Sequence, residues 1–584
     1  MSNSQRKISQ EDYDEAIREN QDIFDLSMED VVEETNDQFK KMLNLPDDAT
    51  FGTASAAAYL SLTHPDSERG KFERNAIQDF TDLLDGLDKF VHPDGSVSFV
   101  DAGGTGGEET SSRKAISDIE RIVSLCTKGS ECGDSVKISL APKTYISLLL
   151  KANAIYTLMS LLGATTTDGE CANEVAQVAA NCLTILTSRS IELRTLFAAF
   201  ESAVGLIASK TECLSQAFDA NDNLALEREL KFLHDMTLLI VAVCRGSENN
   251  KVKFVRTKGS INSIISCIKA LFVVMESTKA GQQIDLAEKA CESSCKCVVV
   301  LCRYEDNKDA GPSIGGMAVS SSHDHAQEFY RSGAVQILTK VTRYSQSKES
   351  LSLASASMAA TRVLAINDEI VQAFVAGGAL ETTRLALSMY GENLTLVSVA
   401  LGVVRNICGN DEIKTTLTGD GTLQQVLICM RKHLNVSTIQ EHGCGTLAAM
   451  ALRKASNACT IATLDGVRDI MNAMRKHESN ILVQRQGSLA CRNIISRSPQ
   501  LRDTFMDLGS EDVLRKAGRF QGSVDEAYAA LRDLGCQVGM SKFDETGKQV
   551  KLQMFGETKP VFNPSFEESK DTQDRITSKA NLSS

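Results

Sequence analysis

One stretch of the chain decides the fold: GTLQQVLICMRKHLNVSTIQEHGCGTLAAMALRKASNACTIATLDG, residues 421–466. A glycine opens it, and the run at 422–433 places apolar residues every three or four positions, as on one face of a helix. A polar break leads to an alanine-rich apolar run at 439–454, and a short run then ends at the next glycine. The stretch therefore predicts three helices in about 45 residues.

The same unit recurs through the second half of the chain. It begins at SGAVQIL, GGALETT, GDGTLQQVL, LDGVRDIM and LGSEDVL, with the marker glycines Gly333, Gly378, Gly421, Gly466 and Gly509. Their spacings of 45, 43, 45 and 43 residues fall in the range of HEAT and armadillo repeats. One such unit cannot bury its apolar stripe alone, so the copies must stack.

Looser copies of the unit begin upstream at 151–162, 201–209 and 258–268. They bring the expected total to about eight repeats between residues 113 and 540. The long step from Gly259 to Gly333 indicates an insertion, which we place in a polar, Gly/Ser-rich loop at 303–325. We therefore predict an all-α, right-handed superhelical solenoid of the armadillo type, in which the third helix of each repeat lines a concave groove.

Charge is unevenly distributed along the chain. Residues 1–110 hold 25 acidic and 9 basic residues, whereas the whole chain has a net charge of −14. The first 110 residues therefore carry −16 and the remainder +2. This asymmetry favours an acidic interaction arm and argues against nucleic acid as a partner, since phosphate would be repelled by the arm.

The cysteines and apolar runs indicate a soluble intracellular protein. The 17 cysteines are odd in number and lie mostly in apolar helical runs, whereas a secreted disulfide framework is short and dense. The first 20 residues contain no apolar signal core, and the run at 237–244 is far too short to span a bilayer. We expect no membrane contact and a cytoplasmic location, with nuclear entry left open.

The flanks of the repeat array differ from it in character. Residues 1–43 are expected to form acidic N-terminal helices, and residues 44–112 a linker with one amphipathic helix at 71–91. The array itself is expected at 113–540, followed by a flexible tail at 541–584. We expect the N-terminal helices to cap the first repeat, to recruit a partner or to inhibit the groove.

Four segments resemble one known family. They are ISQEDYDEAIRENQDIF with EDVVEETNDQF near the start, HDHAQEF at 323–329, AVQIL with TRVLAINDEIVQAFVAGGALETT, and AYAALRDLGCQV at 527–538. Together they resemble the family of armadillo repeat-containing protein 6, over residues 8–43 and 113–540. The resemblance implies a repeat scaffold that binds proteins, without naming the partner. Residues 44–112 and the tail match nothing in that family.

Candidate partner-binding residues follow from the repeat spacing. Arg362, Arg405 and Arg492 are one or two periods apart and should project from equivalent positions, with Arg532 further along. In the wider superfamily, groove asparagines hold the backbone of an extended peptide, and Asn406 and Asn493 match that role by position. A line of guanidiniums favours an acidic segment, because arginine pairs with carboxylates through two hydrogen bonds. The alternative is that these arginines bridge acids on neighbouring helices.

We therefore expect a non-enzymatic, monomeric scaffold or adaptor that binds an extended, acidic segment of another protein. One alternative is an importin-like transport receptor or cargo adaptor, which needs an acidic groove for basic cargo. Another is that the N-terminal helices are the docking site and the groove is structural.

Catalytic and metal-binding motifs are weak in this sequence. His323 and His325 are candidate metal ligands, but a third ligand at fixed spacing is missing. The glycine run at 103–107 lacks the ending that a phosphate-binding loop requires. We expect no cofactor, no small-molecule substrate and no enzymatic activity, and we interpret the cysteines at 291–302 as buried packing residues.

Overall fold

The computed structural model describes residues 68–91, 97, 108–128, 130–132, 138–140, 142–152, 154–163, 170–278, 281–303, 315–520 and 522–538. The expected N-terminal helices at 1–43 and the tail at 541–584 lie outside these residues. The chain divides into two compact units, Met1–Ser332 and Gly333–Ser584. Helices dominate both, as the sequence predicts.

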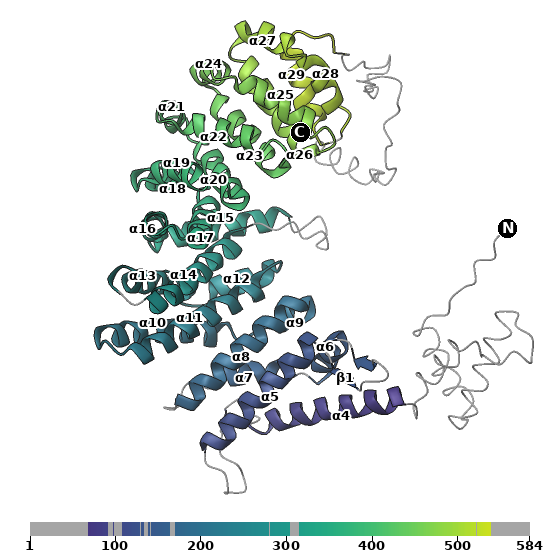
Figure 1. Cartoon of the computed structure of the whole chain (residues 1–584), viewed down its shortest axis with the longest axis vertical. Coiled ribbons are helices and arrows are strands. Elements are labelled where there is room, and N and C mark those ends of the chain that lie inside the picture. The colour runs from purple at the N-terminus through teal and green to yellow at the C-terminus, as the bar shows by residue number, and fades with distance from the viewer. Residues whose placement is uncertain are drawn as a thin grey trace, which may run out of the picture. The chain divides into compact units, whose positions relative to one another are not determined.

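The first unit contains twelve of the described helices and one short strand pair (Figure 1). Strands β1 (Ser130–Cys132) and β2 (Ile138–Leu140) pair antiparallel, with Ser130 opposite Leu140. Helices α5, α8, α11 and α14 pack one on the next. The helices are α4 (Glu68–Asp88), α5 (Glu108–Lys128), α6 (Pro142–Lys151), α7 (Ala154–Gly163), α8 (Glu170–Arg189), α9 (Ile191–Leu196), α10 (Phe200–Asp219), α11 (Asn223–Cys244), α12 (Glu248–Arg256), α13 (Ser260–Ser277), α14 (Gly281–Cys302) and α15 (Gly315–Arg331).

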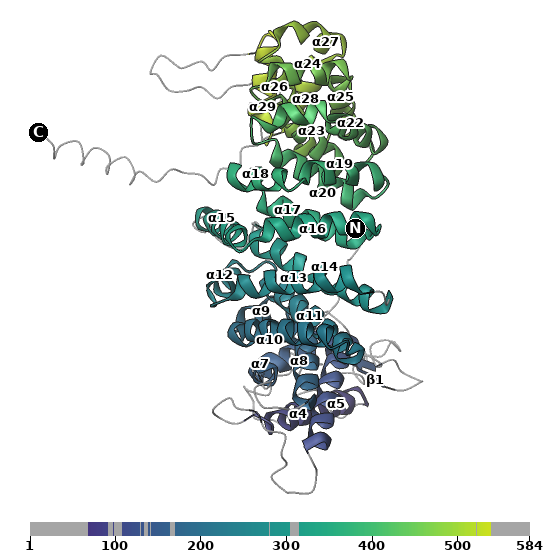
Figure 2. The same cartoon turned by 90° about the vertical axis from the view of Figure 1, so that its left-hand side faces the viewer.

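Figure 2 shows the helices of the second unit in teal to yellow. The sets that begin with α18, α21, α24 and α27 each have a short helix followed by two longer ones. Its third helices, α17, α20, α23, α26 and α29, pack in sequence. The helices are α16 (Ala334–Ser347), α17 (Leu351–Leu364), α18 (Asp368–Ala376), α19 (Ala379–Met389), α20 (Leu394–Ile407), α21 (Ile413–Gly419), α22 (Thr422–Lys432), α23 (Ser437–Ala451), α24 (Ala455–Thr463), α25 (Gly466–Lys476), α26 (Ile481–Ile495), α27 (Arg502–Asp507), preceded by the 3₁₀ turn η2 (Pro499–Leu501), α28 (Ser510–Ala517) and α29 (Val524–Asp533).

Within the described part of the chain, the helices from α6 to α29 group into eight sets of three, preceded by α4 and α5. The prediction of an all-α solenoid of armadillo type with about eight repeats is confirmed. Helix α4 lies close to the amphipathic helix expected at 71–91, and α5 also begins inside the expected linker. The expected loop at 303–325 is wrong for residues 315–325, because α15 begins at Gly315.

In the second unit, the residue that precedes each second helix has a left-handed backbone, which glycine adopts without a Cβ penalty. In four copies this residue is Gly333, Gly378, Gly421 or Gly509, with φ between 64° and 96°. In the remaining copy it is Asp465, with φ 61°, so the marker Gly466 lies one residue too late. Gly466 is required for space instead, since a Cβ there would lie 2.6 Å from Cγ2 of Ile461.

Among the residues that the structure describes, one single helix, Ser260–Ser277, is long and apolar enough to cross a membrane by length and composition alone. It is longer than the run at 237–244 considered from sequence, and 61% of it is buried. It packs between α10 and α14 as the second helix of its repeat. Several of its apolar residues, among them Ile264, Ile268 and Leu271, are fully buried there, which is the expected environment of a core helix.

Buried thiols recur on the third helices. Fully buried examples are Cys182, Cys244, Cys297, Cys444 and Cys491; Cys126 lies on α5, which packs on the third helix α8, and Cys408 directly follows α20. The fifteen cysteines whose side chains the structure describes are free. Their small, polarizable side chains suit the close approach of successive helices.

Candidate functional site

The six predicted site residues all lie on third helices of the second unit. Arg362 is on α17, Arg405 and Asn406 are on α20, Arg492 and Asn493 are on α26, and Arg532 is on α29. Counted from the first residue of each helix, Arg362, Arg405 and Arg492 share one position, eleven residues after the start. Arg532 is only eight residues after the start of α29, so it occupies a different position.

Two of these arginines lie over glycines of the next third helix. A Cβ at Gly402 would come within 2.6 Å of Cζ of Arg362, and one at Gly445 would come within 3.1 Å of Nη1 of Arg405. Both glycines are eight residues after the start of their helices. Each guanidinium is thus held on the neighbouring helix at a place where any larger residue would displace it.

The remaining copies show what replaces this arrangement. The position of the two arginines is occupied by Ala448 in α23, and the position of the two glycines by Leu489 in α26. Where the arginine is absent, the glycine is absent too. A glycine inside a helix costs roughly 1 kcal/mol relative to alanine. Gly402 and Gly445 therefore provide the space that the guanidiniums need.

The two predicted asparagines are hydrogen-bonded within the stack. Nδ2 of Asn406 donates to O of Arg362 at 2.8 Å, and Nδ2 of Asn493 donates to O of Ala448 at 2.9 Å. Both carbonyls occupy the same position on the preceding third helix. Asn493 is only 7% exposed, so its amide joins two repeats and is not presented to a partner.

Arg492 and Arg532 differ from the seated pair. Both are exposed, and Arg532 pairs with Asp533 of its own helix at 2.8 Å. The third helix after α26 is α29. It has Arg532 at the position that Gly402 and Gly445 occupy in their own helices, so it offers Arg492 no glycine at that position. The structure therefore groups Arg362 with Arg405 and leaves the other two arginines outside this group.

Sequence reasoning missed a carboxyl and an imidazole beside the seated arginines. Glu441 and His442 lie on α23, one turn before Gly445, and both are half-buried. Burial raises the pKa of Glu441, although Arg405 and Arg362 act to lower it. Burial and the same two arginines lower the pKa of His442 to about 4. The cluster therefore brings together two guanidiniums, an imidazole that is neutral at neutral pH and the carboxyl group of Glu441.

Buried polar side-chain atoms in this region without a partner among the described residues include Nδ1 of His442 and Oε1 of Gln486. Gln486 is on α26, and its Oε1 would lie 3.1 Å from a Cβ at Gly445, as Nη1 of Arg405 would. Such atoms are rare in folded proteins because each forfeits its hydration. His442 and Gln486 occupy the same position, five residues after the start of α23 and of α26, but Ala356 and Val399 hold it in α17 and α20, so no recurring polar residue marks the position in the sequence.

The two candidate metal ligands, His323 and His325, lie in different surroundings. His323 is exposed, whereas His325 is 5% exposed and its Nδ1 donates to O of Leu301 at 2.9 Å. Burial lowers the pKa of His325. Within the ranges that the structure describes, no group of three or more His, Cys, Asp or Glu residues could hold a metal ion.

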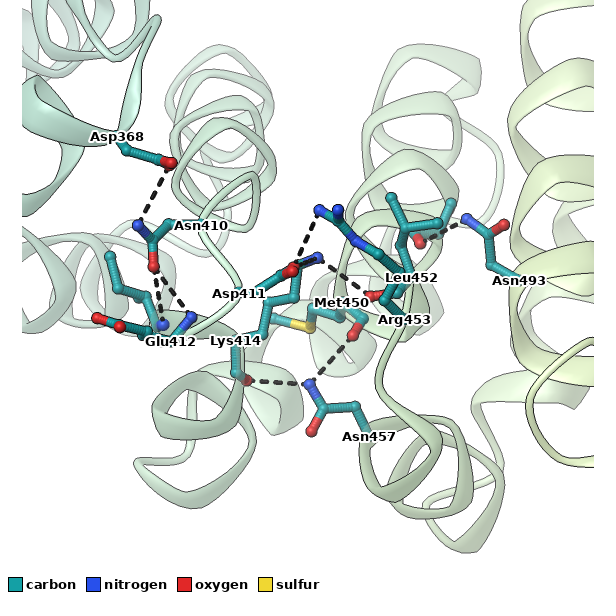
Figure 3. Close-up of polar contacts among 12 residues, drawn as sticks. Asp368, Asn410, Asp411, Glu412, Lys414, Met450, Leu452, Arg453, Asn457 and Asn493 are labelled. Atoms are coloured by element: carbon teal, nitrogen blue, oxygen red, sulfur yellow. Dashed lines mark hydrogen bonds and ion pairs between the residues drawn. The ribbon is translucent and has the colours of Figure 1, made fainter.

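The end of the third helix α23 is tied to neighbouring helices by polar side chains (Figure 3). Nδ2 of Asn457 donates to O of Lys414 and of Met450. Nζ of Lys414, whose side chain is fully buried, pairs with Asp411 at 2.6 Å and donates to O of Leu452. These contacts satisfy carbonyls in the last turn of α23 that have no partner inside the helix.

Two clefts lie on the second helices, away from the seated arginines. One of about 790 Å³ is lined by α10 and α13, and one of about 210 Å³ by α25, α28 and neighbouring residues. The larger cleft is lined mainly by small and polar residues such as Gly205, Ser263 and Ser266. It brings together no cluster of chemically reactive groups.

Comparison with known proteins finds similarity to solved structures alone. No family model matches the chain, and no curated protein matches it. A structure from work on a phosphorylation switch controlling the interaction between cadherin and beta-catenin is 13% identical, with a TM-score of 0.45, covering 74% of this chain and 67% of that one.

Designed armadillo repeat proteins are also similar. One is 16% identical with a TM-score of 0.36, covering 45% of this chain and 98% of that one. Another, in complex with the peptide (KR)4, is 14% identical with a TM-score of 0.34, covering 48% and 98%. The armadillo assignment of this chain rests on its own three-helix repeats.

Proposed function

We propose that the chain is a non-enzymatic scaffold and that the third-helix face around Arg362 and Arg405 binds an extended, acidic segment of a partner protein. The observation that carries the proposal is the seating of both guanidiniums over helix-interior glycines. Side chains held in this way lose little entropy on binding, and arginine suits carboxylates better than lysine does.

The charges around the pair support an acidic rather than a basic partner. The guanidiniums of Arg362 and Arg405 both act on the carboxyl group of Glu441 and outnumber it, while His442 is neutral at physiological pH. An importin-like receptor for basic cargo would need the opposite balance. We further propose a distant relationship to the family of armadillo repeat-containing protein 6, supported by the four sequence segments, and a cytoplasmic, monomeric protein.

A binding experiment with the full chain tests the proposal. The probe is a fluorescein-labelled decamer of glutamate, with a decamer of lysine as its counterpart, followed by fluorescence anisotropy at physiological salt. Replacing Arg362→Gln together with Arg405→Gln should weaken binding of the glutamate peptide by at least about tenfold, since a hydrogen bond to a charged group contributes about 1.5–3 kcal/mol.

The control changes the same two charges elsewhere. Lys340 on α16 and Arg519 after α28 are exposed, so Lys340→Gln with Arg519→Gln should alter the affinity by less than about twofold. Equal binding by wild type and the Arg362/Arg405 variant would refute the proposal. Preferential binding of the lysine decamer would favour the importin-like alternative. Retention of partners by the N-terminal 43 residues alone would favour the docking-helix alternative.

A further inference from the structure

Glu441 lies where it can oppose the binding that the two arginines promote. It is the fifth residue of α23, and Gly445 follows one turn later, so the two positions share a face of the helix. The guanidinium of Arg405 lies against Gly445 on that face. The carboxylate is therefore on the same surface as the arginine that a partner would contact.

The carboxylate of Glu441 is not engaged directly by the arginines. Among the described residues, it makes no ion pair within 4.0 Å and no hydrogen bond. It is nevertheless half-buried and within electrostatic range of both Arg362 and Arg405. A half-buried carboxylate without a direct partner is costly, because it has lost part of its hydration without gaining a hydrogen bond.

Its position adds nothing that the stack itself requires. Polar residues of the third helices bond to neighbouring helices: Nδ2 of Asn406 donates to O of Arg362 in the preceding repeat, and Nε2 of Gln440 donates to O of Met430 in its own repeat. Glu441, directly after Gln440, makes no such bond among the described residues. An isosteric amide at this position would keep the shape of α23 and remove only the negative charge.

We propose that Glu441 is a specificity-determining residue, an internal competitor whose carboxylate lowers the affinity of the Arg362 and Arg405 pair for a partner carboxylate. This inference rests on the proposed function. Glu441 repels every acidic group that approaches, so a segment with a single carboxylate binds weakly, whereas a segment with a carboxylate for each of the two arginines keeps measurable affinity. Glu441 thus sets a threshold of negative charge for binding.

The decisive variant is Glu441→Gln in the full chain, measured with the same labelled glutamate decamer. Binding should tighten by about five- to tenfold, as expected when a like charge a few ångströms away is removed. Circular dichroism and urea unfolding confirm that the variant is folded, and Glu441→Ala provides a second charge removal with the same expected direction.

The matched control is Glu381→Gln, an exposed acid in the first turn of α19, which changes the net charge equally. It should alter binding by less than about twofold. Glu441→Gln should also lose its effect when Arg362 and Arg405 are already glutamine, because the coupling is between these groups.

The outcomes separate this inference from the function on which it rests. If the arginine replacements leave binding unchanged, the proposed function fails. If they weaken binding but Glu441→Gln does not tighten it, the competitor role alone is overturned. Weaker binding by Glu441→Gln would mean that the carboxylate positions the arginines, which also overturns it.

Discussion

Buried side-chain donors at the ends of third helices recur at one position. Asn250, His325 and Asn457 each donate to the carbonyl one residue before the end of the preceding third helix: Val243, Leu301 and Met450. All three donors are at most 5% exposed. His325 therefore makes the same hydrogen bond to a helix-end carbonyl that asparagine makes in the other two copies. This contact explains its burial without a metal ion.

A stability measurement tests whether Asn493 joins two repeats or is available to bind a partner. Asn493→Ala removes its bond to O of Ala448 and leaves that carbonyl buried, so the free energy of unfolding should fall by about 1–3 kcal/mol. Arg492→Ala, one residue earlier and exposed, should cost less than about 0.5 kcal/mol. Urea unfolding followed by circular dichroism measures both, and equal losses would contradict this assignment.

His442 gives the protein a pH dependence with a defined sign. Its pKa is about 4 in the folded chain against 6.5 for an ordinary histidine, so the unfolded chain binds more protons between these values. Stability should therefore fall as the pH drops from about 6.5 to 4, by about 2 kcal/mol from this group. His442→Gln should lose correspondingly less between pH 7 and 4.5 in urea titrations. Parallel losses in both proteins would rule out His442 as the cause.

At the scale of elements, two second helices approach the following third helices through glycine. A Cβ at Gly443 would lie 2.5 Å from Cγ of Met430, and one at Gly487 equally close to Met474. Both methionines are 1% exposed, so they cannot move into solvent. The contrast with Gly402 is informative, because the arginine over that glycine has a flexible end and only half-buried surroundings.

Gly443→Ala should therefore destabilise the protein by about 1–3 kcal/mol through overpacking, despite the better helix propensity of alanine. Gly402→Ala should change stability by less than about 1 kcal/mol, because Arg362 can swing aside and alanine favours the helix. Thermal unfolding of the two variants in parallel makes the comparison. A greater loss for Gly402→Ala would contradict this account of the two contacts.

The helices could be predicted from sequence because each repeat keeps its apolar stripe and its turn. The spacing also placed Arg362, Arg405 and Arg492 at one position, since position on a helix depends on counting alone. Contacts across the stack could not be counted in this way. Asn493 was assigned to a peptide because a period does not show that its amide reaches Ala448, and Glu441 was missed because it has no equivalent in other copies.

At the scale of the whole molecule, repeats contact chiefly their neighbours within each unit. Stability in such arrays is close to a sum of repeat and interface contributions, and the terminal layers are held from one side only. Local unfolding should therefore begin in the first and last helical layers of the stack. The left-handed Asp465 adds a local weakness in one turn, where glycine serves in the other copies.

The rate at which each buried thiol reacts reports how often its helical layer opens. Burial raises the pKa of Cys126, Cys244, Cys408 and Cys444 to about 12, so alkylation of each thiol must wait until its own layer exposes it. A time course with iodoacetamide, resolved by peptide mass spectrometry in mild urea, should modify Cys126 before Cys244. The native cysteines thus record the order in which the helical layers unfold, with no engineered label.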